Sequence, residues 1–125
     1  MAAACAFCTA AEERIVAQNR LAYALRDTAP VTPLHTLILP KRHVTSYFDL
    51  DGKEKRATDA ILEEVRGAIL AQDPSVAGFN IGVNIGEVAG QTIAHCHVHL
   101  IPRRPGDVAN PAGGIYAALG RVLGR

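Results

Sequence analysis

The segment from His95 to Ile101 reads His-Cys-His-Val-His-Leu-Ile, with a histidine at every second position. Successive side chains of a β-strand point to opposite faces, so a strand would align His95, His97 and His99 on one face at intervals of roughly 6.5 to 7 Å. On a helix the same side chains would fan out around the axis and could not converge. The segment therefore predicts a strand that presents three imidazoles on one face and turns Cys96, Val98 and Leu100 toward the core.

The rest of the chain divides into short apolar segments and one long periodic segment. Strands are expected at 21–25, 34–39, 78–85 and 93–101, separated by stretches rich in proline, glycine and aspartate. The last two of these strands are expected to form a hairpin around the glycine-bounded turn at 86–90. Beyond Arg104 the chain is turn-rich, with a short apolar tail at 115–123.

Helices are indicated at two places. Asp51 and Glu54 have the spacing of a capping box, and apolar residues then recur at three- and four-residue steps, which predicts an amphipathic helix over about 52–71. Thr9 and Glu12 have the same capping spacing and indicate a short helix near 10–15. We expect an α+β fold with an antiparallel sheet of about five strands, one long helix and a short N-terminal helix.

Size, charge and hydropathy narrow the class of protein. The 125 residues suit a single domain over 1–125, with a core at about 5–104 and a tail at 105–125. With 13 basic and 12 acidic side chains, no strong field favours a nucleic-acid partner. No apolar stretch reaches the roughly 18 to 20 residues that span a bilayer, and the N-terminus lacks the pattern of a signal peptide, so we expect a cytoplasmic protein without a membrane partner.

Three aligned imidazoles have three interpretations from the residues alone. They are ligands of a catalytic metal, or structural histidines, or a nucleophile with its supporting groups. A catalytic metal usually takes carboxylates as well, and the nearest one, Glu87, lies across a turn. An imidazole is mostly unprotonated and nucleophilic at neutral pH, which favours the third interpretation. Separately, Cys5-x-x-Cys8 is half of a metal site or a redox pair.

The histidine segment resembles the signature of the histidine triad (HIT) family, His-x-His-x-His followed by two apolar residues. It is preceded by Gly90-Gln91-Thr92 and followed by Pro102-Arg103, as in many members. The resemblance extends to Asp27 and to the segments 33–43 and 78–84. Two positions depart from the pattern: Ala94 stands where an aromatic residue is common, and Leu34 stands where many relatives have glycine.

The resemblance implies a role for each matching residue. His97 is the nucleophile that attacks the α-phosphorus of a nucleotide, His99 stabilises charge, and His35 supports the triad as a fourth histidine, so that the catalytic set is His35, His95, His97 and His99. The residues implied to bind nucleotide are Asp27, which holds the ribose hydroxyls, together with Asn84, Gly90, Gln91, Thr92 and His99. Phe7, Leu25, Thr28 and Ile38 are implied to frame the base.

The resemblance also implies a structural zinc ion, of the type found in many bacterial members. Its ligands would be Cys5, Cys8, His43 and His95, so that His95 belongs to two sites. No organic cofactor is implied. The fold usually dimerises into one continuous sheet, so a homodimer is expected.

The expected activity is hydrolysis of nucleoside phosphoramidates or dinucleoside polyphosphates through a nucleotidyl-histidine intermediate, with purine nucleotides such as AMP conjugates as substrates. Two alternatives stay open. The same chemistry transfers a nucleotide to phosphate or a sugar phosphate, although His99 argues against the transferases, whose third residue differs. The second alternative is a nucleotide sensor or adaptor without catalysis, because the same pocket serves both purposes.

Overall fold

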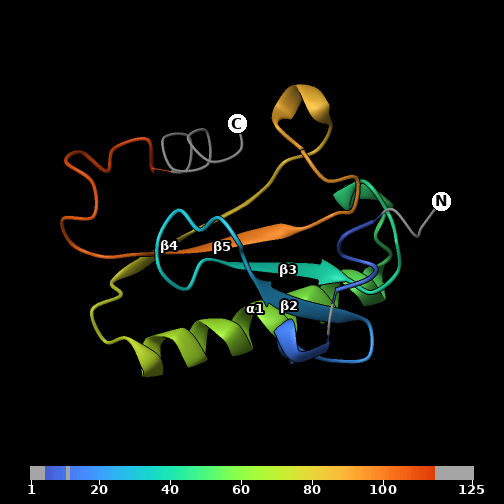
Figure 1. Cartoon of the computed structure of the whole chain (residues 1–125), viewed down its shortest axis with the longest axis horizontal. Coiled ribbons are helices and arrows are strands. Elements are labelled where there is room, and N and C mark those ends of the chain that lie inside the picture. The colour runs from blue at the N-terminus through green and yellow to red at the C-terminus, as the bar shows by residue number, and fades with distance from the viewer. Residues whose placement is uncertain (1–4, 11, 115–125) are drawn as a thin grey trace.

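A computed structural model describes residues 5–10 and 12–114 as one five-stranded antiparallel sheet with a long helix on one face (Figure 1). The strand order is β1-β2-β3-β5-β4. The elements are β1 (Ile15–Gln18), β2 (Ala22–Arg26), β3 (Thr36–Pro40), α1 (Gly52–Gln72), β4 (Gly78–Val83) and β5 (Val98–Arg103), with 3-10 turns η2 (Glu12–Arg14), η3 (Tyr47–Asp49) and η4 (Glu87–Ala89). The α+β prediction is confirmed. The apolar tail at 115–123 lies outside the described residues.

Helix α1 begins and ends where the sequence indicates. The side chain of Asp51 accepts a hydrogen bond from the Glu54 amide, and the Glu54 side chain accepts one from the Asp51 amide, which completes the predicted capping box. The helix ends at Gln72, before Asp73 and Pro74, because proline disfavours helical geometry in the residue before it. The predicted apolar stripe is buried against the sheet at Ile61, Val65 and Ile69.

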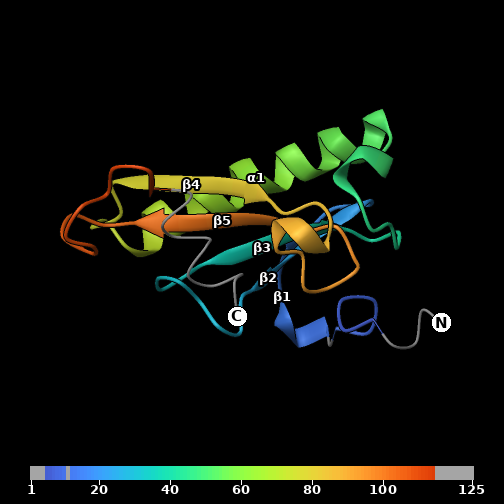
Figure 2. The same cartoon turned by 90° about the horizontal axis from the view of Figure 1, so that it is seen from above.

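The two faces of the sheet carry different layers (Figure 2). Alternation along β2 and β3 turns Ala22, Ala24 and Ile38 toward α1, in the core that also holds Val98 and Leu100 of β5. The opposite face carries a second cluster that includes the N-terminal segment: Phe7, Tyr23, Leu25, Leu37 and Leu39. His99 pairs with Leu37 in the β3–β5 register and belongs to this second face. The histidine segment therefore faces away from the helix.

Three local features differ from the sequence-based expectation. The short N-terminal helix is a single 3-10 turn, η2, and the Thr9 hydroxyl donates to the Cys5 carbonyl oxygen. Strand β1 was not expected; it is a four-residue edge strand with an irregular register against β2. Strand β5 begins at Val98, later than the expected residue 93, so His95 and His97 precede it.

The late start of β5 has a local cause at the end of β3. Pro40 has no amide hydrogen to donate to a neighbouring strand, and its carbonyl oxygen accepts instead from Nε2 of His95 at 2.9 Å. The amide of Cys96 donates to the Val44 carbonyl oxygen at 2.7 Å, beyond β3. The alternation of side chains nevertheless continues through this stretch, because Cys96 is buried with Val44 and Leu50 while the flanking histidines face the other way.

None of the helices in the described part of the chain has the length and apolar character needed to cross a membrane.

The start of α1 should make stability depend on acid pH. Arg42 donates to both carboxylate oxygens of buried Glu54, at 2.9 and 2.7 Å, and the hydrogen bonds from Arg42 lower the pKa of Glu54 below 4.5. The unfolded chain then binds a proton at higher pH than the folded chain. This contribution to stability is present above about pH 4.5 and is lost as the pH falls through the folded-state pKa. We expect Glu54→Gln to lower the urea midpoint at pH 7 and to flatten its decrease in acid.

The matched control is Glu64→Gln, an exposed residue on the same helix. Urea unfolding of both variants between pH 3 and pH 7 makes the comparison. An equal change in both variants would contradict a special role for Glu54.

Candidate active site and metal centre

His97 presents one defined ring nitrogen to a cavity. Its Nδ1 lies 2.8 Å from the His95 carbonyl oxygen, and because a carbonyl only accepts, Nδ1 carries the hydrogen. The lone pair of the neutral ring is therefore on Nε2. Burial lowers the pKa of His97, which keeps the ring neutral and nucleophilic near neutral pH.

His99 is fixed in the opposite tautomer by its neighbour. The amide of Val31 donates to Nδ1 of His35 at 3.1 Å, so in neutral His35 the hydrogen is on Nε2. That Nε2 lies 2.9 Å from Nδ1 of His99 and donates to it. The hydrogen of His99 is then on Nε2, a buried atom with no hydrogen-bond partner among the described residues. Burial lowers the pKa of His99 to about 3, so the ring stays neutral.

The two imidazoles line a cavity of about 270 Å³. The sequence-predicted residues that line it are Phe7, Asp27, Thr28, Thr92, His97 and His99. A nucleophilic nitrogen, a hydrogen-bond donor and a carboxylate thus share one cavity with apolar walls, which is the usual composition of a small-molecule site. In this arrangement the nitrogen of His97 could attack an electrophilic centre, the donor on His99 could bind an anionic oxygen on that centre, and the apolar walls could hold an apolar group attached to it.

Asp27 and His35 are held together by the loop between β2 and β3. Oδ1 of Asp27 accepts from the Ala29 amide at 2.9 Å, and Oδ2 lies 3.5 Å from Nε2 of His35. Leu34 in the same loop has φ of 73°, the left-handed conformation that costs a non-glycine residue about 1–2 kcal/mol. The position where Leu34 departs from the family pattern is thus one whose backbone favours glycine.

The turn before the triad uses most of its polar groups internally. Oε1 of Gln91 accepts from the Gly86 amide, and its Nε2 donates to the carbonyl oxygens of Thr45 and Ile93. Gly90 has φ of 96°, and its amide donates to the Glu87 carbonyl oxygen at 3.0 Å. Gln91 and Gly90 therefore shape the loop and do not line the cavity, and neither does Asn84, whose buried Nδ2 has no partner among the described residues.

Four lining residues were not predicted from the sequence: Ala6, Arg14, Leu37 and Ile93. Arg14 is the charged one, and its Nη2 donates to the Arg26 carbonyl oxygen at 3.3 Å, beside Asp27. It reaches the cavity from η2, immediately before β1, and no motif marks it. Of the other predicted base contacts, Leu25 is buried under this face and Ile38 faces the helix, in the main core.

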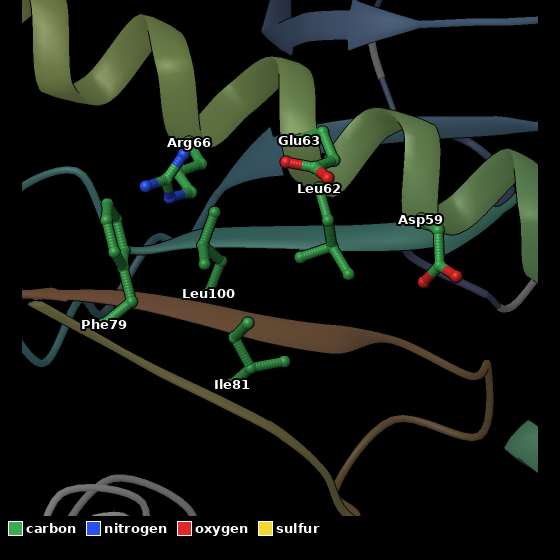
Figure 3. A pocket seen from close by; sticks show the side chains of 7 residues that line it. All are labelled: Asp59, Leu62, Glu63, Arg66, Phe79, Ile81 and Leu100. Atoms are coloured by element: carbon green, nitrogen blue, oxygen red, sulfur yellow. The ribbon is translucent and has the colours of Figure 1, made fainter.

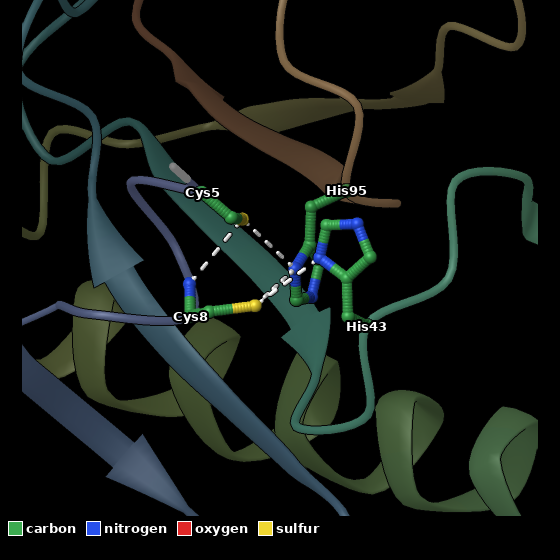
Figure 4. A group of neighbouring side chains, drawn as sticks. All are labelled: Cys5, Cys8, His43 and His95. Atoms are coloured by element: carbon green, nitrogen blue, oxygen red, sulfur yellow. Dashed lines mark hydrogen bonds between the residues drawn. The ribbon is translucent and has the colours of Figure 1, made fainter. Parts of the chain in front are cut away.

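The four residues predicted to bind zinc converge on the N-terminal side of the same face (Figure 4). One ligand atom from each of Cys5, Cys8, His43 and His95 lies within 4.8 Å of all the others. Sγ of Cys8 is 3.1 Å from Nδ1 of His43, and Sγ of Cys5 is 3.4 Å from Nδ1 of His95. Nε2 of His95 donates to the Pro40 carbonyl oxygen, so the lone pair on Nδ1 faces the sulfur atoms.

The donor set fits zinc. Two thiolates and two neutral imidazoles are a common tetrahedral set for a structural zinc ion, and such sites leave no open position for a substrate. The carbonyl that orients His95 is the kind of outer partner that fixes the tautomer of a metal-bound imidazole. The predicted site is therefore assembled in this fold by residues far apart in the sequence.

Comparison with known proteins places this geometry in a family. The sequence model of the HIT domain family matches residues 9–106 of this chain. Among curated relatives, a HIT-like protein of Mycoplasma pneumoniae is 35% identical over 79% of this chain and 71% of its own length. The AP-4-A phosphorylase of Mycobacterium tuberculosis is 34% identical over 77% of this chain and 49% of its own length. The bis(5'-adenosyl)-triphosphatase of Dictyostelium discoideum is 34% identical over 79% of this chain and 66% of its own length.

A solved structure shows the same architecture. The crystal structure of a Zn-bound histidine triad family protein from Mycobacterium smegmatis superimposes with a TM-score of 0.76 and 26% identity, covering 98% of this chain and 97% of that protein. The family match spans most of the described residues, including the histidine segment. The chain belongs to the histidine triad (HIT) family.

Proposed function

We propose that this protein is a nucleotide-binding hydrolase that cleaves dinucleoside polyphosphates or nucleoside phosphoramidates at the α-phosphorus through a covalent intermediate on His97. The observation that supports it best is the pair of opposite tautomers in one cavity. Nε2 of His97 carries a lone pair, and Nε2 of buried His99 carries a hydrogen that has no partner among the described residues. One nitrogen attacks phosphorus while the other donates to the developing charge.

The reaction proceeds in two displacements. Nε2 of His97 attacks the α-phosphorus, a P–N bond forms, and the bond from phosphorus to the leaving group breaks as its electron pair departs with that group. The hydrogen on Nε2 of His99 stabilises oxygen at the reacting phosphate. Water then attacks the same phosphorus and loses a proton to the solvent, the P–N bond breaks, and His97 recovers its lone pair as nucleoside monophosphate leaves.

Other residues position the substrate. Asp27 accepts from the two ribose hydroxyls, a role that suits a carboxylate because it receives two donors at once. Thr92 hydrogen-bonds the phosphate from the wall of the cavity. Gln91 and Gly90 act by holding the loop that carries Thr92 in place. Asn84 offers to the phosphate or sugar edge its Nδ2, for which the described part of the chain supplies no partner.

The relatives support the substrate class. The names AP-4-A phosphorylase and bis(5'-adenosyl)-triphosphatase both refer to dinucleoside polyphosphates, so we propose adenine nucleotides joined through phosphate as the first substrates to test. The phosphorylase also makes transfer to phosphate the second candidate activity. Turnover in the presence and absence of phosphate distinguishes a transferase from a hydrolase.

Replacement of His97 should abolish the covalent step. We expect His97→Ala to reduce kcat by roughly a thousandfold or more on diadenosine polyphosphate and on a fluorogenic adenosine phosphoramidate. Acid quenching of native protein with radiolabelled substrate should trap a phosphoramidate adduct that the variant lacks. Unfolding curves of both proteins control for loss of the buried ring. Equal turnover by the two proteins would contradict the mechanism, and no turnover by native protein on either substrate would favour the sensor.

We also propose that the Cys/His cluster binds a structural zinc ion, with Cys5, Cys8, His43 and His95 as ligands. Metal bound there would tie the N-terminal segment to the sheet, because the ligands come from the segment before η2, the loop after β3 and the loop before β5. His95 would thereby connect the metal site to the triad. Zinc in this coordination supplies folding free energy and no catalytic position.

Metal analysis tests this site. Native protein should contain about one zinc ion per chain, as expected for a single four-ligand site, and Cys8→Ala should lose it and melt at a lower temperature. The matched control is Cys96→Ala, because Cys96 is buried with Val44 and Leu50 away from the cluster. A native sample without zinc, or equal zinc in the two cysteine variants, would refute the site.

We propose a homodimer formed through β4. This strand pairs only with β5 among the described elements, and a groove of about 340 Å³ runs between it and α1 (Figure 3). Ile81 of β4 is 53% exposed at this groove, which is large for an isoleucine on a sheet. The other side of the groove is lined by charged residues of α1, which are Asp59, Glu63 and Arg66. Because both signs of charge are present, the groove could form ion pairs with the same residues of a second copy related by twofold symmetry.

A charge on this strand should separate the two copies. Native protein is expected to have the mass of a dimer in analytical ultracentrifugation, and Ile81→Lys should shift it to monomer because an ammonium group would be buried at the interface. Val16→Lys, on β1 at the opposite edge, is the matched control and should stay dimeric. A monomeric native protein, or dissociation by both substitutions, would overturn the proposed interface.

A further inference from the structure

Phe7 is placed between the Cys/His cluster and the candidate nucleophile. It lies inside the Cys5-x-x-Cys8 segment and is 6% exposed. Its ring packs edge-on against His95, with centroids 5.8 Å apart and an angle of 86°, and against His97, with centroids 5.1 Å apart and an angle of 68°. One aromatic ring therefore touches a candidate metal ligand and the ring that attacks phosphorus.

His97 is 5% exposed, and further contacts also constrain its ring. Its Nδ1 hydrogen bond to the His95 carbonyl oxygen fixes the tautomer, and the His99 ring packs against it with centroids 5.1 Å apart. Phe7 is a third neighbour of the ring and also lines the cavity. A smaller side chain in place of Phe7 would open space beside His97, and the imidazole would gain rotational freedom about its bond to Cβ.

Phe7 itself is held by the segment around it. The Tyr23 hydroxyl donates to the Phe7 carbonyl oxygen, and the Phe7 ring belongs to the cluster of apolar side chains under this face. On either side, the sulfur atoms of Cys5 and Cys8 contact the imidazoles of His95 and His43. Loss of these sulfur contacts would leave Tyr23 and apolar packing to hold the ring.

We propose that Phe7 is a positioning residue that couples the Cys/His cluster to the orientation of the His97 ring. This proposal rests on the proposed function, in which His97 is the nucleophile. When the four ligands are held together, Phe7 keeps Nε2 of His97 directed into the cavity. When the cluster is released, Phe7 moves away and the covalent step slows, although neither the cysteines nor His43 line the cavity.

The coupling is tested with Phe7→Leu, which stays apolar but removes the aromatic edge, and with Phe48→Leu as the matched control. Phe48 is 76% exposed and lies outside the cavity and the cluster. We expect Phe7→Leu to lower kcat on diadenosine polyphosphate by roughly tenfold to a hundredfold, as misplaced reacting groups do, with a smaller change in KM. Phe48→Leu should match native protein.

A readout that does not need turnover comes from the histidine side chains. Long-range proton–nitrogen NMR of zinc-loaded native protein should show His97 as a single Nδ1–H tautomer, identified by its absence from His97→Ala. The same signals should broaden or average in Phe7→Leu and in chelator-treated native protein. Zinc content and melting temperature are measured for every sample, so that loss of metal or of folding is separated from movement of His97.

Non-additivity completes the test. Chelation should lower the turnover rate of native protein but should lower that of Phe7→Leu little further, because chelation and the substitution both release the His97 ring. Equal slowing of both proteins by chelation, or an unchanged His97 spectrum in a slowed Phe7→Leu, would overturn the coupling. Absence of turnover and of a trapped adduct in native protein would instead refute the proposed function, and the spectra would still report whether Phe7 orients His97.

Discussion

The pairing of β3 with β5 is the constraint on which the rest of the site depends. It is short, with Thr36, Leu37 and Ile38 opposite Leu100, His99 and Val98, and it joins β1, β2 and β3 to the β4–β5 hairpin. This register places His35, just before β3, beside His99 of β5. It also brings the end of β3 to the residues before β5, where Pro40 meets His95. A one-residue slip would turn His99 to the opposite face and separate both pairs.

Backbone groups then make three evenly spaced histidines chemically different. The Pro40 carbonyl directs the hydrogen of His95 to Nε2 and leaves Nδ1 for the cluster with the cysteines. The His95 carbonyl directs the hydrogen of His97 to Nδ1 and leaves Nε2 toward the cavity. The hydrogen of His99 is directed to Nε2 by His35, whose Nε2 donates to Nδ1 of His99 and whose Nδ1 accepts from the Val31 amide. Identical side chains thus differ in tautomer because each has a different hydrogen-bond partner, a backbone carbonyl for His95 and for His97 and the His35 ring for His99.

Periodic and paired features could be predicted from the sequence, and features that depend on one tertiary contact could not. The capping box and apolar stripe of α1 lie within one segment, so its bounds were predicted within one residue. Strand β1 is short, exposed at the edge and irregular in register, so its four residues carry little pattern. The role of Gln91 depends on three backbone groups, one of which, the Thr45 carbonyl, lies in a different loop. Arg14 reaches the cavity from η2, which no motif marks.

The cavity contains an unsatisfied donor that the fold itself does not explain. Folded proteins seldom leave a buried polar group unpaired, because each one costs about 1–3 kcal/mol. Nε2 of His99 is such an atom within the described residues, and its ring is kept neutral by burial, so it neither charges nor finds a protein acceptor. The His35 contact that fixes its tautomer also prevents the ring from turning the hydrogen inward. An acceptor from a ligand would remove this cost, and in the proposed reaction a phosphate oxygen beside Nε2 of His97 supplies one.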